Sequence, residues 1–259
     1  MKAARYVRAL LALVAAGSLA ATTGCSTLHG VTSPRSARAS ASGSTSTSAH
    51  GPGTTDVDCN KAKCVALTFD GGPSKPTPNL LDILREKHVH ATFFVQGKGH
   101  TDTYSKTLSR MAREGHEIGN HTWSHKILTK LSVRQIHAEL DPVQEAVREI
   151  TGHTPVLMRP PQGRTDDKVS EVLRKMGLAQ VLWSVTAKDY ATTDTAVITK
   201  RVLEQTRRDG IILLHDRYPG TIPAVPGIID TLRERGYTIV TVSQLLAPAE
   251  PVPGTVYRP

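Results

Sequence analysis

Short apolar, β-rich runs alternate with amphipathic helical patterns along most of the chain, and this alternation constrains the fold more than any other feature. Most of the helical stretches between these runs end on a glycine, as helices commonly do. The expected strands are CVALTF (64–69), ATFFVQ (91–96), HEIGNH (116–121), VLMRP (156–160), QVLWSV (180–185), GIILLHD (210–216) and YTIVTV (237–242). Alternation of this kind predicts an α/β fold with a parallel sheet.

A closed or nearly closed (β/α) barrel competes with an open doubly wound sheet, and the placement of polar residues favours the barrel. Nearly every unusual polar residue follows a different expected strand; these residues are Asp70, His121, Arg159, Asp189 and His215. In a barrel the carboxyl ends of the strands meet on one face, where active sites form. In an open sheet only the residues at the switch point meet.

The first 24 residues have the layout of a secretory signal. Lys2, Arg5 and Arg8 precede an apolar run from Ala9 to Ala21, which is too short to span a membrane. The small residues before Cys25 resemble a bacterial lipobox, which predicts a lipid anchor at Cys25. The alternative is a cleaved secretory peptide without an anchor. Both predict an exported protein, either held at the cell envelope or secreted.

Composition divides the rest of the chain into a linker, one folded unit and a tail. Residues 25–58 are rich in Ser, Thr and Ala with almost no large apolar residues, so we expect a disordered tether. Residues 59–247 carry the strand–helix alternation and form the expected domain. Residues 248–259 are rich in proline and are expected to be a tail.

Cys59 and Cys64 lie five positions apart, directly before the first strong apolar run. In an exported protein this spacing favours a disulfide over free thiols or a metal site.

The formal net charge of +9 includes five basic residues within the first 38 positions, where no acid occurs, and this leaves +4 for the remainder. No block of Lys and Arg with interleaved aromatic residues suggests a nucleic-acid partner. We expect a monomer that meets a membrane only through an anchor at Cys25.

His121 and His125 have the i, i+4 spacing that places two imidazoles on one side of a helical turn, where they are able to share a metal ion.

His215 closes a strongly apolar strand, and Asp216 or another nearby acid would hold it as a general acid. Arg159 is either a surface guanidinium or a fixed partner for Asp70. A metal pair, an acid, a base and an arginine together fit metal-assisted hydrolysis.

The ordered segments TFDGGP, NHTWSH, RPPQG, KDY and LLHD resemble the polysaccharide deacetylase family, also called NodB-homology carbohydrate esterases. The resemblance covers roughly residues 63–246. It implies a distorted (β/α) barrel with the active site at the C-terminal ends of the strands. It also implies a divalent metal, commonly zinc with cobalt, nickel or manganese as other candidates, and an acetylated glycan such as peptidoglycan, chitin or xylan as substrate.

The resemblance also implies a role for each matching residue. Asp70 matches the general base, His121 and His125 the metal ligands, and His215 the general acid. The supporting residues that it implies are Arg159, which braces the base; Asp189, which tunes His215; Gln162, whose backbone N–H helps to hold the oxyanion; Leu213, a wall of the acetyl pocket; and Tyr190, which stands where tryptophan is usual.

One departure from the family pattern bears on the chemistry. The family has TFDDGP in its first segment, and the second Asp is a metal ligand, whereas this chain has Gly71 there. Thr186 likewise replaces a common Asp. Two hypotheses follow: an exported glycan deacetylase with an altered metal site, or a catalytically impaired relative that binds cell-wall glycan through the same groove.

Overall fold

The computed structural model describes residues 30–41 and 57–259. The strands are β1 (Val31–Thr32), β2 (Lys63–Asp70), β3 (Thr92–Val95), β4 (Glu117–Asn120), β5 (Leu157–Met158), β6 (Ala179–Val181), β7 (Val185–Thr186), β8 (Gly210–His215), β9 (Tyr237–Val240) and β10 (Val256–Tyr257). The α-helices are α1 (Pro34–Ala41), α2 (Thr77–Glu86), α3 (Ser105–Arg113), α4 (Val133–Thr151), α5 (Asp167–Lys175), α6 (Thr195–Gln205), α7 (Thr221–Glu234) and α8 (Val242–Leu246). Shorter helical turns span Gly97–Thr101, Leu128–Lys130, Pro161–Gly163 and Asp189–Ala191.

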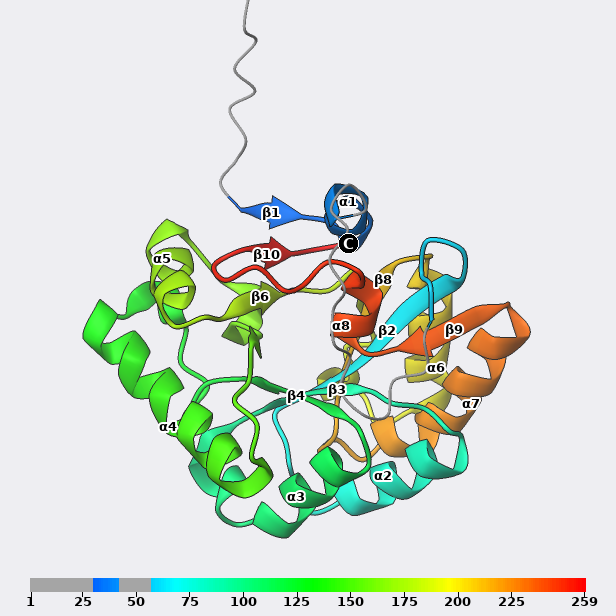
Figure 1. The fold of residues 1–259 in the computed structure, drawn as a ribbon. Coiled ribbons are helices and arrows are strands. Elements are labelled where there is room, and N and C mark those ends of the chain that lie inside the picture. Colours follow the sequence, from blue (N-terminus) through cyan, green and yellow to red (C-terminus); the bar gives the residue numbers. More distant parts are fainter. Residues whose placement is uncertain (1–29, 42–56) are drawn as a thin grey trace, which may run out of the picture.

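The sheet is a curled, distorted barrel, as expected (Figure 1). Its strands follow the order β1-β10-β6-β5-β4-β3-β2-β8-β7, with β9 on β2, and every pairing among the described residues is parallel. Among the described strands no pairing joins β6 to β7, and residues 182–184 connect the two along the chain. The run QVLWSV, expected as one strand, is therefore two short ones with different neighbours.

Strand β2 is the centre of the sheet. Strand β8 pairs with its residues from Val65 to Asp70, so β9 and β3 have to share the other edge. Along β2, Leu67 and Phe69 point to the helix-covered core, while Thr68 and Asp70 alternate to the barrel interior. This alternation explains why an apolar strand ends in a carboxylate that faces inward.

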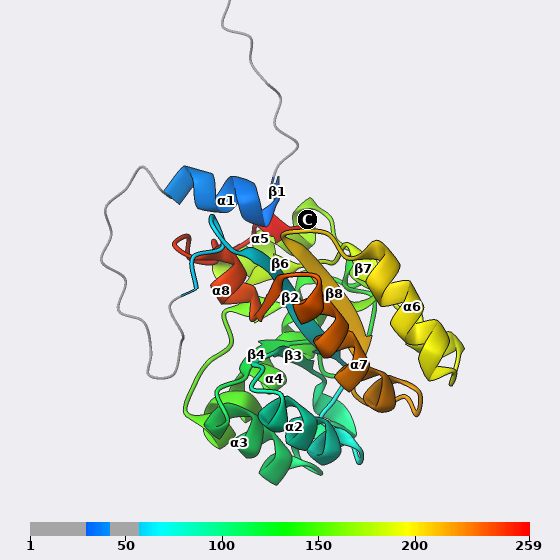
Figure 2. The same cartoon turned by 90° about the vertical axis from the view of Figure 1, so that its right-hand side faces the viewer.

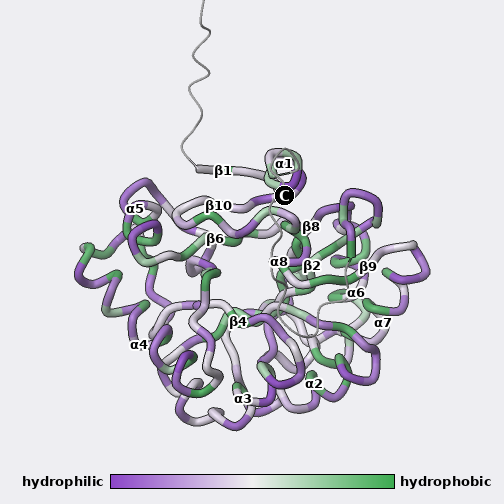
Figure 3. The backbone as a smooth tube through the Cα atoms, viewed as in Figure 1, coloured by the Kyte–Doolittle hydropathy of each residue, from purple (hydrophilic) through white to green (hydrophobic). Residues whose placement is uncertain are grey.

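The helices surround the sheet in a matching order. Helix α6 packs on α7, α7 on α2, α2 on α3, α3 on α4 and α4 on α5, and Figure 2 shows this row from the side. The tube is green along much of the central strands and mainly purple over the outer helices (Figure 3). The main core lies between them, with Leu67, Phe93 and Leu214 on the sheet and Leu80 and Ile228 on the helices. Within the described part of the chain, no helix is long and apolar enough to cross a membrane.

The disordered linker predicted for residues 25–58 is wrong for its part between residues 31 and 41, which forms β1 and α1. Arg38 of α1 is 1% exposed and donates hydrogen bonds to Asp209 at 2.7 Å and to the Leu245 carbonyl at 2.6 Å. A buried arginine with a carboxylate partner fastens a helix that has almost no apolar face. The signal segment and Cys25 lie outside the described residues.

The proline-rich tail is also part of the fold. Strand β10 pairs with β6 on one side and β1 on the other. The Leu182 N–H donates to the Tyr257 carbonyl, whereas the Ser184 N–H donates to the Ile211 carbonyl of β8. The tail therefore pairs with β6 where a regular barrel would have its next strand, which explains the distortion.

Cys59 and Cys64 form the expected disulfide, with an S–S distance of 2.04 Å. Both are fully buried at the start of β2, and the Arg208 guanidinium donates to the Cys59 carbonyl. The bridge lies at the end of β2 opposite Asp70, so it belongs to the base of the barrel.

Candidate active site

The carboxyl ends of the strands bring the expected polar residues together. Asp70 ends β2 and lies opposite His215, the last residue of β8, in the strand register. His121 directly follows β4, and Arg159 directly follows β5. Four segments far apart in the sequence therefore converge on one end of the barrel, as the parallel sheet requires.

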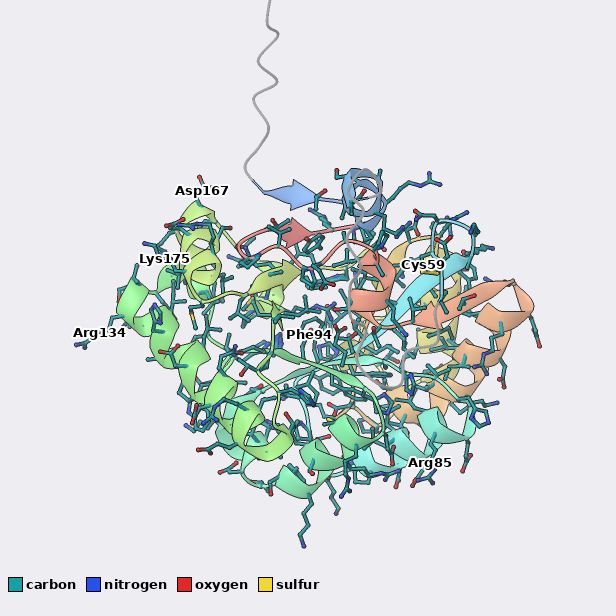
Figure 4. The ribbon with its side chains drawn as sticks, viewed as in Figure 1. Cys59, Arg85, Phe94, Arg134, Asp167 and Lys175 are labelled. Atoms are coloured by element: carbon teal, nitrogen blue, oxygen red, sulfur yellow. A yellow bond between two sulfur atoms is a disulfide. The ribbon has the colours of Figure 1, made fainter. Side chains whose placement is uncertain are left out.

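Asp70 and Arg159 form a buried ion pair. The Arg159 Nη1 lies 2.7 Å from Asp70 Oδ1, and the side chains are 0% and 4% exposed. The same nitrogen donates to Thr68 Oγ1, while Arg159 Nε donates to the Val181 carbonyl at 3.0 Å. The guanidinium carbon also lies 4.2 Å from the ring centre of Phe94, labelled near the middle of Figure 4. Arg159 is thus a fixed partner of Asp70 and not a surface guanidinium, and these contacts hold the carboxylate in one orientation.

The two glycines after Asp70 have different structural requirements. Gly71 has φ +81°, a conformation that favours glycine, yet a Cβ there would meet no atom closer than 3.7 Å. At Gly72 a Cβ would lie 1.9 Å from Asp216 Oδ2, so a side chain has no room. Position 71 therefore has space for a side chain that would point toward the site, and position 72 does not.

The loop that carries His121 and His125 is fastened to α4. Glu139 accepts hydrogen bonds from both the N–H and the Oγ of Ser124, and its carbonyl accepts from the Trp123 N–H. His121 is 3% exposed, its Nδ1 pairs with the Arg159 carbonyl at 2.8 Å, and its Nε2 lies 3.8 Å from Asp70 Oδ2. With Nδ1–H as the donor, Nε2 is left with a lone pair. Burial lowers the pKa of His121 to about 4, so the ring is neutral at neutral pH.

His215 is held by Asp189, not by its sequence neighbour Asp216. Its Nδ1 lies 2.8 Å from Asp189 Oδ1, and its backbone N–H donates to Oδ2 of the same carboxylate. Thr221 Oγ1 donates to that carboxylate as well. Burial alone would raise the pKa of Asp189, but these hydrogen bonds outweigh it and hold the pKa below its ordinary value. A carboxylate fixed in this way holds the imidazole in one orientation.

The remaining predicted residues line the same end of the barrel. Gln162 is exposed and has φ +59° in the turn after Arg159, where the N–H groups of Gly163 and Arg164 make the turn's own hydrogen bonds. Leu213 lies on β8, and Tyr190 is 57% exposed with its ring centre 6.1 Å from that of His215.

The donor set does not fit a catalytic metal ion. His121 and His125 have ring centres 4.9 Å apart and offer two imidazoles, while Gly71 and Thr186 offer no carboxylate. Within residues 30–41 and 57–259, no group of three or more His, Cys, Asp or Glu side chains is placed to hold a metal. Catalytic zinc takes three protein ligands. The predicted metal pair therefore lacks a third ligand.

Near the site, sequence reasoning missed Arg217 and considered Asp216 only as a possible partner of His215. Asp216 is fully buried, accepts from Thr77 Oγ1 at 2.6 Å, and has a pKa that burial raises to about 6. Arg217 follows it in the loop before α7, with its guanidinium beside the space that a side chain at position 71 would enter. The only signal in the sequence is that Arg217 comes two positions after His215, at the end of the last segment of the family pattern.

The match to known proteins extends over most of the described chain. A family model described as polysaccharide deacetylase matches residues 58–181. The peptidoglycan-N-acetylmuramic acid deacetylase PdaC of Bacillus subtilis is 42% identical over 190 residues, which are 73% of this chain and 40% of that protein. The chain thus spans about two fifths of that relative. A chitooligosaccharide deacetylase of Bradyrhizobium is 35% identical over 73% of this chain and 93% of that protein.

Solved structures agree with this result. A structure described as T48 deacetylase with substrate matches with a TM-score of 0.74 and 41% identity, covering 78% of this chain and 99% of that one. A mutant of BA3943, described as a family 4 carbohydrate esterase pseudoenzyme with restored enzymatic activity, matches with a TM-score of 0.68 and 26% identity, covering 72% and 68%.

Proposed function

The chain belongs to the polysaccharide deacetylase family, and from this membership and the geometry of its site we propose that it is an exported hydrolase that removes N-acetyl groups from a cell-wall glycan of the peptidoglycan type. One observation carries the proposal. Two oriented pairs, Asp70 with Arg159 and His215 with Asp189, lie at the carboxyl ends of adjacent strands. The first suits a base and the second suits an acid.

The proposed reaction uses one water molecule. Asp70 accepts a proton from this water as the water oxygen bonds to the acetyl carbon, and the carbonyl π electrons move onto the carbonyl oxygen. The Gln162 N–H donates a hydrogen bond to that oxyanion. The oxyanion then reforms its double bond, the C–N bond breaks with its electron pair on nitrogen, and His215 donates a proton to that nitrogen. The products are a free sugar amine and acetic acid, which loses its proton to solvent as acetate. Asp70 then returns its proton to solvent and His215 takes one up, which restores the starting state.

The supporting groups have separate tasks. Arg159 keeps the Asp70 carboxylate in one orientation, because its guanidinium is fixed by Thr68 and the Val181 carbonyl. Asp189 keeps Nδ1 of His215 occupied, so the proton to be donated is carried by Nε2. Leu213 and Tyr190 would bound the acetyl pocket.

Deacetylases of this family depend on a divalent metal in general, but the donor set of this chain falls one protein ligand short. We therefore assign no step to a metal ion. A protein-bound zinc, cobalt, nickel or manganese ion would show in elemental analysis of the protein purified without chelator, and we expect less than one tenth of an equivalent.

The direct test is acetate release from peptidoglycan and from N-acetylglucosamine oligomers by the purified chain, with and without a chelator. Release that is lost in His215→Asn supports the proposal, because this variant removes the acid but keeps a polar side chain. Absence of release from every acetylated glycan, including xylan, would overturn it.

A second candidate function is a catalytically impaired protein that binds glycan in the same groove. Gly71 and Thr186, which replace two family carboxylates, favour it, and the family contains at least one relative described as a pseudoenzyme. Co-sedimentation with insoluble peptidoglycan, combined with no acetate release, is the expected result for this alternative.

Export and anchoring belong to the same proposal. The N-terminal layout and the extracellular substrates of the named relatives support a location at the cell envelope, and the acetylated glycan is the expected partner of a monomeric domain. Cell fractionation of the full chain and of Cys25→Ala distinguishes a protein anchored through a lipid at Cys25 from a freely secreted one. An anchored protein leaves the membrane fraction for the medium on substitution, whereas a secreted one is in the medium in both cases.

A further inference from the structure

Arg217 lies where a third metal ligand would project from position 71. An ideal Cβ on Gly71 would be 3.7 Å from Arg217 Nη1 and 3.8 Å from both Cζ and Nε. Because these three guanidinium atoms are almost equally far from the Cβ position, the planar group faces that position with its side and not with a single atom. Position 71 is thus open to a short side chain, and the first group such a side chain would meet is a cation.

No nearby carboxylate among the described residues forms an ion pair with this cation, although its charge acts on the buried Asp216, whose Oδ2 accepts a hydrogen bond from Thr77. Asp70 is committed to Arg159, and Asp189 to His215. Across the part of the chain that the structure describes, no carboxylate forms an ion pair with Arg217 within 4 Å. The guanidinium lies 5.4 Å from the ring centre of Tyr218, itself a neighbour of His215.

The positive charge of Arg217 also acts on the candidate metal pair. The guanidinium is close enough for its charge to interact with His125, so it repels a cation held there. The same repulsion opposes a divalent ion more strongly than it opposes a proton, because the interaction scales with charge. The chain thus combines the loss of an anionic ligand at position 71 with a cation beside the vacated position.

A guanidinium also has a binding chemistry of its own. It presents several N–H donors in a planar fork that matches the two oxygens of a carboxylate. Arg217 is exposed and so is reachable by a ligand. The small carboxylate that arises at this end of the barrel is acetate, if the proposed function holds.

We propose that Arg217 is the resident cation of this site: it binds acetate, and the carbonyl oxygen from which acetate is formed, and it keeps divalent metal ions away from His121 and His125. The identity of the anion rests on the proposed function, whereas the exclusion of metal does not. Gly71 and Arg217 then act as a matched pair, because an acid at position 71 would be captured by the guanidinium.

The test is a double-substitution cycle at positions 71 and 217, read by calorimetric titration with zinc chloride and, separately, with sodium acetate. Gly71→Asp alone should bind zinc weakly, since the new carboxylate pairs with Arg217. Gly71→Asp combined with Arg217→Ala should bind zinc at least 100-fold more tightly than Gly71→Asp alone. Gly71→Asn in place of Gly71→Asp is the uncharged control and should not show this gain.

Acetate binding should show the opposite pattern. Arg217→Ala should weaken it at least 10-fold, and Gly71→Asp should weaken it similarly by occupying the guanidinium, while Gly71→Asn should retain it. Arg217→Lys keeps the charge but not the fork, so it should still exclude zinc while binding acetate several-fold more weakly. Arg134→Ala, which removes an exposed arginine on the outer side of α4 (Figure 4), should match the unsubstituted chain in both titrations.

Three results would overturn the proposal: zinc binding by the unsubstituted chain as tight as by the double variant, no gain in zinc affinity when Arg217→Ala is added to Gly71→Asp, or acetate binding unchanged in Arg217→Ala. Circular dichroism melts confirm that each variant is folded. None of these readouts needs turnover. A chain that releases no acetate from any glycan, yet shows the expected titrations, contradicts the proposed function and leaves this inference standing.

Discussion

The two sides of the candidate site are built differently. On one side, Asp70 with Arg159 and Asp189 with His215 are buried or half-buried pairs, and each has further hydrogen bonds to neighbouring strands or helices. On the other side, His125 and Arg217 are exposed, and Gly71 is buried but has room for a short side chain beside the Arg217 guanidinium.

This difference explains how the chain can lack a family ligand and still keep the fold. A buried charge without its partner costs several kcal/mol, so either pair is hard to change one residue at a time. The position of Gly71 carries no such constraint, because a missing side chain there leaves no buried polar group unpaired. We infer that the side with the Asp70–Arg159 and Asp189–His215 pairs depends on the packing of the barrel. The side with Gly71, His125 and Arg217, here called the cation side, is free to vary.

The largest effect is expected at Asp70. Asp70→Asn keeps the size of the side chain but removes both the base and the partner charge of Arg159. Acetate release should fall by about 10²–10⁴-fold, and the free energy of unfolding should fall by about 3 kcal/mol. Steady-state kinetics and urea denaturation measure the two.

Asp167→Asn, at the exposed start of α5 (Figure 4), is the control and should change neither quantity strongly. Normal turnover in Asp70→Asn would mean that the base has been assigned to the wrong residue.

The next effect concerns a buried ion pair that serves structure alone. Arg38→Met leaves Asp209 without its closest cation, so the free energy of unfolding should fall by about 3 kcal/mol, while kcat is unchanged. Arg35→Met provides the matched control, since Arg35 is 72% exposed and 3.8 Å from the same carboxylate. It should cost less than about 1 kcal/mol. Equal losses in the two variants would show that α1 is not fastened by the buried arginine.

A smaller effect depends on pH and arises away from the site. Burial lowers the pKa of His116 to about 3, so the unfolded chain binds its proton more readily between pH 6.5 and 3. The free energy of unfolding is therefore highest above pH 6.5 and falls as the pH decreases, by about 2 kcal/mol between pH 7 and pH 5.

His116→Gln should flatten this dependence, which urea denaturation at the two pH values will measure. His137→Gln, at an exposed histidine on α4, should leave it in place. A variant at position 116 that keeps the full acid sensitivity would point to another buried group. In His116→Gln, the loss of activity at low pH then reflects the titration of groups in the site and not the loss of folded protein.

The smallest effect tests whether the cation side tolerates change. Gly71→Ala meets no close atom but places a side chain at φ +81°, which should cost about 1–2 kcal/mol in the free energy of unfolding. Gly227→Ala in α7 also meets no atom within 4 Å, yet its helical backbone should make it neutral or stabilising. Thermal melts compare the two. A much larger loss at Gly71 would mean that this side of the site is as constrained as the other.

Several features were accessible from the sequence because they depend on local order along the chain. Alternating apolar runs predicted the strands, and the position of a polar residue after each run predicted which residues meet. The disulfide between Cys59 and Cys64 was predicted from the spacing of the two residues and from the expected export, and the structure contains it. In contrast, composition suggested that the segment around Arg38 and the tail around Tyr257 would not fold. Both are ordered through contacts with residues more than 70 positions away, which no local pattern contains.

The sequence alone determined the parallel barrel, the identity of the polar residues at its strand ends and the absence of a carboxylate at position 71. These features follow from the residue types and from the spacing of apolar residues along the chain. For His215, the residue pattern left Asp216 open and the family resemblance indicated Asp189, which the structure places against it. Only the tertiary structure decided that Arg217 lies beside Gly71. The reason is that loops from different strands meet there, and a guanidinium 146 positions away along the chain reaches the space left open by a residue without a side chain.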